Sequence, residues 1–154
     1  MKRLIVDAAV CAGCRICEMV CSFRHEERFS PSLSRVTVIK VDEFGMDYPV
    51  FCRQCGTCPP VDGCPTDALT AENGMVVLDK EACTGCGICI EACTYGAIKM
   101  DESTKPLICD LCGGEPVCAE RCPTEAITFE EAEAFSETPE DAFRELRERW
   151  GIGD

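Results

Sequence analysis

The 154-residue sequence has few of the side chains that build a large apolar core or a common catalytic site. Aromatic residues make up 6% of the chain, and there is a single histidine. One histidine excludes a histidine-based metal site, and the sequence holds no Ser-His-Asp arrangement and no glycine-rich nucleotide loop after a strand. The sequence therefore predicts a small scaffold that needs disulfides or bound metal in addition to apolar packing, and that carries no catalytic residues.

Long apolar runs and positive charge are also scarce. No run approaches the roughly 18 apolar residues of a membrane span, and the apolar segment before Asp7 is too short for the core of a signal peptide. The formal net charge is −13, from 28 acidic and 15 basic residues. Nucleic acid is disfavoured as a partner because its phosphates require a basic surface. We expect a cytoplasmic protein whose partners present complementary basic patches.

Cysteine, in contrast, is abundant, with 16 residues in four groups of four. Reduced cytoplasmic thiols more often bind metal than form disulfides. In the first three groups, three cysteines stand at successive i+3 positions, which favours the corners of a [4Fe–4S] cubane over the two close pairs of a zinc site. Four zinc ions in a structural binding module remain the alternative. The groups are Cys11, Cys14, Cys17 and Cys21; Cys52, Cys55, Cys58 and Cys64; Cys83, Cys86, Cys89 and Cys93; and Cys109, Cys112, Cys118 and Cys122.

The cysteine pattern is duplicated. The first and third groups have the same spacing and follow similar apolar segments that end in aspartate, Leu4–Asp7 and Val76–Asp79. The second and fourth groups both end in Cys-Pro-Thr and an acidic residue, at Cys64 and Cys122. In two-cluster ferredoxins the last cysteine of one run ligates the cluster held by the other run. The pattern therefore predicts two such modules.

The linking segments predict which groups share clusters. Two apolar strands flank Asn73-Gly74, a strong hairpin signal, so the second and third groups form an inner module. The first and fourth groups then pair around the outside, with strands Leu4–Val6 and Ala126–Phe129 side by side. The alternative is a serial pairing, in which the first group pairs with the second and the third group pairs with the fourth. The predicted ligand sets are site 1, Cys11, Cys14, Cys17 and Cys122; site 2, Cys109, Cys112, Cys118 and Cys21; site 3, Cys52, Cys55, Cys58 and Cys93; and site 4, Cys83, Cys86, Cys89 and Cys64.

The expected fold class is α+β: a duplicated, nested bacterial-ferredoxin-like fold with short antiparallel sheets around four [4Fe–4S] clusters, plus a C-terminal helix. Short helical turns are expected after each fourth cysteine. An inserted hairpin at about 35–51 is expected to have strands Arg35–Val41 and Tyr48–Phe51 around a turn at Glu43–Asp47. The expected parts are a four-cluster unit at 1–129, divided into an inner module at about 48–100 and an outer module at about 1–30 with 101–129, and an acidic tail at 130–154.

The tail predicts an amphipathic helix at about 139–150. Thr138 is the expected N-cap, Pro139 the first residue, and Asp141 the acidic residue three after the cap. The apolar face packs either on the chain's own core or on a partner or second copy, and both readings stay open. The face consists of Ala142, Phe143, Leu146 and Trp150, and the pairs Glu140–Arg144 and Glu145–Arg149 are expected on the other side.

Four polar residues lie near the predicted ligands. We expect His25 in a solvated loop, since the cysteines alone complete four clusters. Arg15, Arg53 and Arg121 each adjoin a predicted ligand, where a cation would stabilise the reduced cluster. We expect these arginines instead to be solvated or paired with carboxylates.

On its sixteen cysteines, residues 1–129 resemble the four-cluster ferredoxin subunits of multi-subunit oxidoreductases. These include the electron-transfer subunits of dimethyl-sulfoxide-reductase-like enzymes, formate hydrogenlyase and carbon monoxide dehydrogenase. The resemblance, which includes Cys64-Pro65 and Cys122-Pro123, implies the nested ligand sets and electron transfer without catalysis. Cys58 departs from the family's spacing: it lies two residues early, where Pro60 takes the usual place.

Two stretches resemble a narrower group. Cys-Arg-Ile-Cys-Glu-Met-Val-Cys-Ser-Phe-Arg-His-Glu at 14–26 and Phe-Ser-Pro-Ser-Leu-Ser-Arg-Val at 29–36 are similar to small iron–sulfur subunits of tungsten-dependent aldehyde oxidoreductases. That resemblance implies relay between a tungsten- or molybdenum-pterin subunit and a flavin subunit or other acceptor. The alternatives are a free polyferredoxin shuttle, or a subunit of a benzoyl-CoA reductase, carbon monoxide dehydrogenase or hydrogenase complex.

Overall fold

The computed structural model describes residues 1–133 and 137–153. Its longest helices are α1 and α5, and none of the described helices is long and apolar enough to cross a membrane. The helices are α1 (Ile16–Glu26), α2 (Pro59–Asp62), α3 (Ile88–Ala92), α4 (Val117–Glu120) and α5 (Pro139–Trp150), with 3₁₀ turns η1 (Ala8–Val10), η2 (Pro31–Leu33) and η3 (Leu111–Gly114). The strands are β1 (Lys2–Val6), β2 (Thr37–Val41), β3 (Met46–Val50), β4 (Leu69–Glu72), β5 (Met75–Leu78), β6 (Lys99–Met100), β7 (Pro106–Leu107) and β8 (Ile127–Glu131).

The strands form antiparallel two-stranded sheets, as the predicted fold class requires: β1 with β8, β2 with β3, β4 with β5, and β6 with β7. The hairpin predicted at Asn73-Gly74 joins β4 and β5, and both turn residues have positive φ, 51° and 79°. A two-residue hairpin turn requires this conformation, which asparagine and glycine tolerate best. The long-range pair of β1 and β8 places Leu4 opposite Phe129, so that prediction is also confirmed.

The inserted hairpin is present with shifted bounds. Strand β2 begins at Thr37 rather than Arg35, and β3 begins at Met46 rather than Tyr48. The turn is shorter than expected because Gly45 adopts a positive φ of 65°, which lets the chain reverse within four residues and the β3 strand start earlier.

The expectation of helical turns after each fourth cysteine is confirmed only at Cys21 and is wrong for the other three groups. Helices α2, α3 and α4 instead end just before Cys64, Cys93 and Cys122. In the first and last of these, a proline follows the cysteine, and the residue before a proline is disfavoured in the helical region. Serine follows Cys21, so α1 continues through that cysteine to Glu26.

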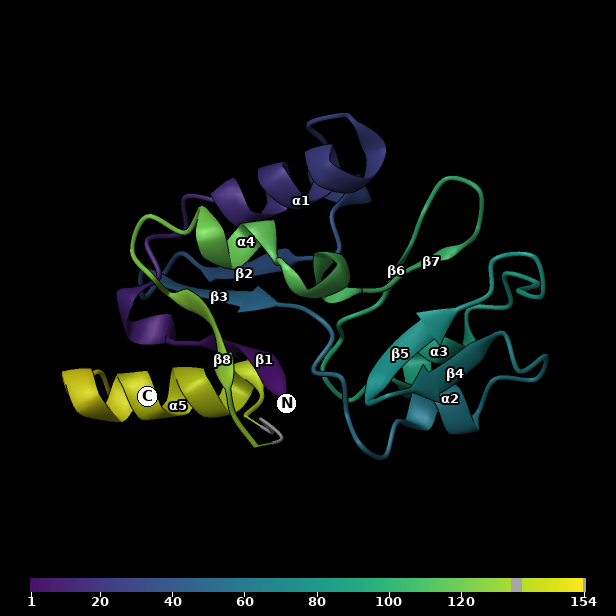
Figure 1. Cartoon of the computed structure of the whole chain (residues 1–154). Coiled ribbons are helices and arrows are strands. Elements are labelled where there is room, and N and C mark those ends of the chain that lie inside the picture. Colours follow the sequence, from purple (N-terminus) through teal and green to yellow (C-terminus); the bar gives the residue numbers. More distant parts are fainter. Residues whose placement is uncertain (134–136, 154) are drawn as a thin grey trace.

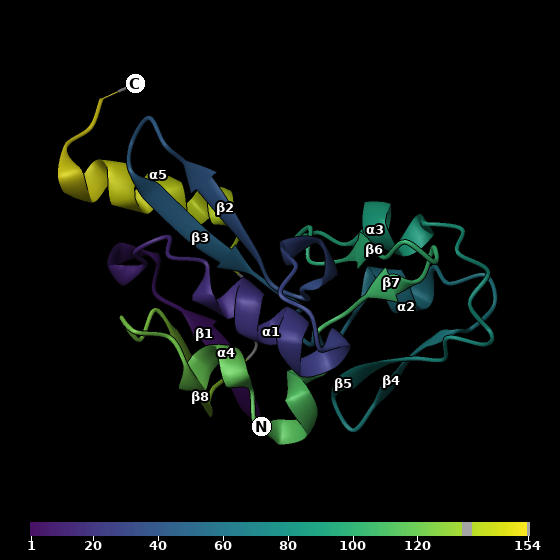
Figure 2. The ribbon, with the colours of Figure 1, turned by 90° about the horizontal axis from the view of Figure 1, so that it is seen from above.

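The elements gather in two groups, each around its own core (Figures 1 and 2). Helices α1, α4 and α5 surround the β1–β8 and β2–β3 sheets, and a smaller group contains α2, α3 and the β4–β5 hairpin. The larger core contains Tyr48 and Phe51, and the smaller one contains Leu69 and Val76. Both cores also include predicted ligands, namely Cys17, Cys21, Cys109 and Cys118 in the larger and Cys58 in the smaller. The cysteines are therefore part of what the fold packs around.

Helix α5 packs on its own chain. Ala142 and Leu146 are buried, and the ring of Phe143 meets Tyr48 of β3 edge-on at 6.1 Å between centroids. Trp150, expected on the same face, is instead 45% exposed, because it is the last residue of α5, directly before the left-handed Gly151 that ends the helix. The apolar face of α5 is thus covered in cis over its first two turns.

The charged face of α5 differs from the expectation. Arg144 pairs with Asp141 at 2.6 Å, an i,i+3 contact, rather than with Glu140. Asp141 is already oriented by the capping box, in which its Oδ2 accepts from the Thr138 backbone N–H at 3.2 Å and its own N–H donates to the Thr138 Oγ1 at 3.1 Å. Because the Asp141 carboxylate is already held in place, forming an ion pair with it costs less side-chain entropy than pairing with a mobile carboxylate.

Replacing Thr138 with alanine is expected to destabilise α5 locally by about 1 kcal/mol, the usual effect of losing an N-cap. Amide hydrogen exchange along 139–150 measures this, and exchange should speed up by about fivefold while the rest of the chain is unaffected. Thr138→Ser keeps the capping oxygen and is the matched control. Equal exchange rates in the alanine and serine variants would contradict the capping role.

Candidate metal centres

The four cysteine loops have the same turn conformation after their first cysteine. In each loop, the residue two positions after the first cysteine has a positive φ between 52° and 73°: Gly13 at 61°, Gln54 at 52°, Gly85 at 73° and Leu111 at 54°. The backbone N–H of each of these residues donates to the sulfur of the first cysteine in its own loop. At Gly85 a Cβ would lie 2.6 Å from the Thr104 carbonyl oxygen, so this position requires glycine. The duplication seen in the sequence therefore extends to backbone geometry.

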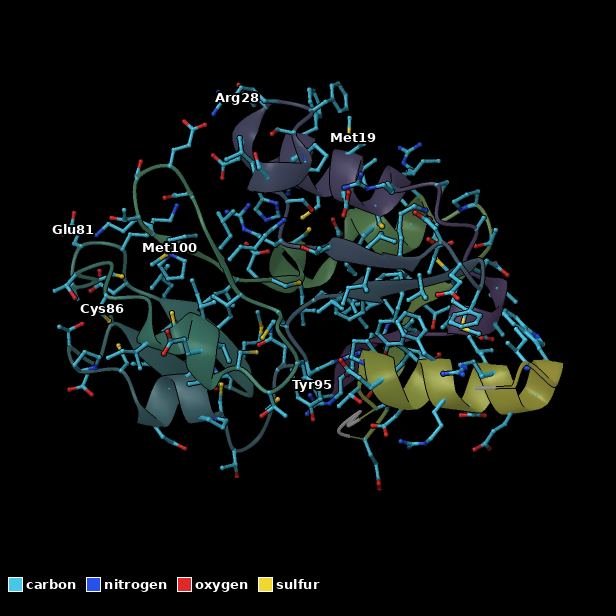
Figure 3. All side chains as sticks on the ribbon, turned by 180° about the vertical axis from the view of Figure 1, so that it is seen from behind. Met19, Arg28, Glu81, Cys86, Tyr95 and Met100 are labelled. Atoms are coloured by element: carbon cyan, nitrogen blue, oxygen red, sulfur yellow. The ribbon has the colours of Figure 1, made fainter. Side chains whose placement is uncertain are left out.

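Two of the predicted ligand sets surround small cavities. The cysteines of site 4 line one beside β4 and β5, and those of site 3 line the other. Cys58, whose spacing departs from the family, lies in the wall of the second cavity directly before Pro59 begins α2. Figure 3 places Cys86 of site 4 at the outer edge of the smaller group of elements.

The cysteines of sites 1 and 2 also lie close together. Burial raises the pKa of the Cys11 thiol, and repulsion from Cys122 and Cys14 raises it further. Burial likewise raises the pKa of Cys118, with added repulsion from Cys21 and Cys112. The structure therefore brings Cys122 to the first loop and Cys21 to the fourth, over more than 90 residues in each case.

Adjacent sites approach one another at two cysteine pairs. Cys17 of site 1 contributes to the raised pKa of Cys118 of site 2, after burial and nearer cysteines. Cys52 of site 3 contributes in the same way to the raised pKa of Cys109 of site 2. Sites 3 and 4 are joined by the packing of α2 on α3. The four groups thus form a row in the order 1, 2, 3 and 4.

Two of the fourth cysteines, Cys64 and Cys122, sit among hydrogen-bond donors. Burial alone would raise the pKa of the Cys64 thiol, but the N–H groups of Thr66 and Leu69 outweigh it and lower the pKa. At Cys122 the N–H groups of Ile127 and Thr124 have the same effect. Donors aimed at sulfur favour the thiolate, the form that binds metal.

Several thiols in sites 1 to 3 need a nearby cation to ionise. Burial raises the pKa of Cys17 and of Cys52 to about 12, and it raises that of Cys109 well above its ordinary value. A buried thiolate without positive charge is strongly disfavoured, whereas a coordinated metal deprotonates the thiol outright. These sulfurs are therefore suited to a metal centre and not to free thiol chemistry.

His25 does not lie in a solvated loop. It is on α1, its side chain is 12% exposed, and its ring contacts the Cys21 carbonyl oxygen at 2.9 Å and Asp110 at 3.0 Å. The hydrogen bond to Asp110, and then that to Cys21, raise the pKa of His25 to about 10. The expectation failed because the helix does not stop after Cys21. His25 thereby ties the first cysteine group to the fourth.

The three arginines beside ligands differ from one another. Arg15 pairs with Glu18 at 2.6 Å and Arg121 lies near Glu120 at 3.5 Å, and both are exposed, as expected. Arg53 is only 5% exposed, so the expectation of a solvated side chain is wrong for it. Its guanidinium donates to the Tyr48 hydroxyl at 2.6 Å and lies among aromatic rings.

Sequence reasoning missed the residues that join the two groups of elements. Buried Gln54 donates to the Cys109 carbonyl at 2.6 Å and accepts from the Val76 N–H at 2.7 Å. Arg3 of β1 donates to the carbonyls of Arg53 at 3.0 Å and Gln54 at 2.8 Å. No local pattern marks either residue, because their partners lie about 20 to 55 positions away.

The donor sets fit a [4Fe–4S] cluster. A zinc ion holds four thiolates at about 2.3 Å, which leaves no empty space among the sulfurs. The four cysteines of sites 3 and 4 instead surround cavities, with donors pointing at sulfur from the loops. Complete cysteine sets of this kind define a ferredoxin-like electron-transfer protein.

The chain belongs to the 4Fe-4S dicluster domain family, whose model matches residues 44–132. It is 37% identical over 116 residues to the electron transport protein HydN of Escherichia coli K12, covering 70% of this chain and 64% of HydN. It is 40% identical over 92 residues to the polyferredoxin-like subunit of an aliphatic sulfonate oxidoreductase from Pyrococcus furiosus, covering 58% of this chain and 53% of that one. The chain thus spans about half to two thirds of the length of these relatives.

A solved structure resembles nearly the whole chain. It is the active-site complex BamBC of benzoyl coenzyme A reductase with benzoyl-CoA, matched with a TM-score of 0.53 and 26% identity over 99% of this chain and 92% of that chain. The likeness extends beyond the family model to the N-terminal 43 residues and the tail.

Proposed function

We propose that the chain relays electrons through four [4Fe–4S] clusters, one in each of sites 1 to 4, between a catalytic oxidoreductase subunit and a flavin subunit or other acceptor. The observation that carries the proposal is the row of four complete cysteine sets. When bound, each cluster takes up and releases single electrons. The chain itself binds no organic substrate in this account.

The protein's own residues hold the clusters and set their environment. The loop N–H groups and those around Cys64 and Cys122 donate to sulfur, which stabilises the thiolates. Burial of Cys21, Cys109 and Cys118 of site 2 and of Cys58 of site 3 keeps water from the middle of the row. Hydrogen bonding and burial are the means by which a protein tunes such centres.

Both ends of the row are open to a partner. Cys86 is exposed, and Figure 3 places it at the edge of the smaller group of elements. Cys14 of site 1, at the other end of the row, is exposed as well. Electrons can enter at one end and leave at the other only if ligands are exposed at both ends. The exposed end ligands and the buried ligands between them meet this requirement.

For the partner, we propose a tungsten- or molybdenum-pterin enzyme that oxidises aldehydes. The support is the resemblance of residues 14–26 and 29–36 to the small subunits of such enzymes, and the net charge of −13, which suits a basic docking surface. A second candidate is an aromatic-acyl-CoA reductase complex, favoured by the likeness to BamBC over nearly the full chain.

Affinity purification of the tagged full-length chain from its native host, without oxygen, tests the partner. We expect a stable complex that contains tungsten or molybdenum by elemental analysis and oxidises aldehydes with a viologen dye as acceptor. A complex that instead reduces benzoyl-CoA would favour the second candidate. A monomer that carries iron and no second metal would contradict both and indicate a free shuttle.

A further inference from the structure

Arg53 is a buried cation in the wall of site 3. It follows Cys52 directly and lines the same cavity as the four cysteines of that site. Its guanidinium carbon lies 5.1 Å from the ring centre of Phe51 and 5.7 Å from those of Tyr48 and Tyr95. Figure 3 shows Tyr95 between the two groups of elements, so this aromatic cage stands where they meet. Arginine stays charged at every working pH.

Arg3 is a second cation at the same site, contributed by β1. Its Nη1 donates to the carbonyls of Arg53 and Gln54, the two residues that follow Cys52. These two carbonyls belong to the loop between Cys52 and Cys55, so the Arg3 guanidinium lies against the loop that carries two ligands of site 3. A cation at partly buried positions acts more strongly than one in water.

We propose that Arg3 and Arg53 stabilise the reduced, more negative state of the cluster held by Cys52, Cys55, Cys58 and Cys93. The two cations thereby raise the reduction potential of site 3. This inference rests on the proposed function. Reduction adds one electron to the bound cluster, with no bond made or broken and no proton taken from either arginine. The Glu137 carboxylate, which accepts from the Tyr48 hydroxyl at 3.4 Å, offsets part of the positive charge.

Anaerobic redox titration of the full-length protein with dithionite, followed by electron paramagnetic resonance, tests the proposal. For Arg53→Gln and Arg3→Gln we expect one of the cluster potentials to fall, with at least a tenfold decrease in the equilibrium constant for one-electron reduction, which is about 59 mV. Arg53→Lys retains the charge and should restore most of the potential. Tyr48→Phe removes only the hydrogen bond and should leave the potential nearly unchanged.

Arg121→Gln is the matched control, since Arg121 also adjoins a predicted ligand but is 66% exposed. Its potentials should equal those of the wild type. Potentials in the Arg53 and Arg3 variants that move no further than in this control, at unchanged iron content, would overturn the proposal. If Arg53→Gln loses iron, Arg3→Gln alone decides. A wild-type protein without iron and sulfide would instead refute the proposed function itself.

Discussion

Removing iron and sulfide is expected to unfold most of the chain, not to leave a folded apoprotein. The buried residues of both cores include Cys17, Cys21, Cys58, Cys109 and Cys118, and aromatic residues are only 6% of the sequence. Without clusters, the sulfurs that face the two cavities lose the group they surround. In proteins of this kind the free energy of metal binding is also free energy of folding.

Circular dichroism of protein treated with an iron chelator and an oxidant measures the effect. We expect the cooperative thermal transition to disappear and the near-ultraviolet signal of the core around Tyr48 and Tyr95 to be lost. Anaerobic reconstitution with ferrous iron and sulfide is the control and should restore both. An apoprotein that melts cooperatively near the temperature of the loaded form would show that apolar packing alone holds the fold.

The second large effect concerns cysteines far apart in the sequence. Cys11→Ala and Cys122→Ala are each expected to remove the cluster of site 1, so that iron falls from about 16 to about 12 atoms per chain. Because both act on one site, the double variant should also retain about 12. Additive losses, leaving about 8, would contradict the assignment of these two residues to one cluster.

A second double variant separates the nested from the serial pairing. With Cys11→Ala and Cys64→Ala together, nested pairing predicts the loss of two clusters and about 8 iron atoms per chain. Serial pairing would join the first and second groups, so the same variant would keep about 12. Iron analysis of the Cys11→Ala variant and of the two double variants therefore distinguishes the two arrangements directly, with Cys11→Ala as the reference.

The features that the sequence predicted well are those set by residues close in the chain. The turn at Asn73-Gly74, the cap at Thr138 and the cysteine spacing each depend on a few neighbouring residues and elementary backbone geometry. The pairing of β1 with β8 is long-range, but the predicted module required it; the register, with Leu4 opposite Phe129, was not predicted.

The features that the sequence did not predict depend on contacts across the fold. Arg3 reaches the loop after Cys52 only because β1 pairs with β8 and lies beside that loop. His25 became part of the link to Asp110 because α1 continues past Cys21, where no proline follows. A side chain that bonds to a distant backbone carbonyl leaves no periodicity or spacing in the sequence, so pattern analysis had no signal to detect.

The most direct test of the account is anaerobic purification with iron and sulfide analysis and a visible spectrum. The account predicts a brown protein, bleached by dithionite, with about 16 iron and about 16 sulfide per chain. A colourless protein with about four zinc ions and no sulfide would contradict it and leave the cysteines with a structural role.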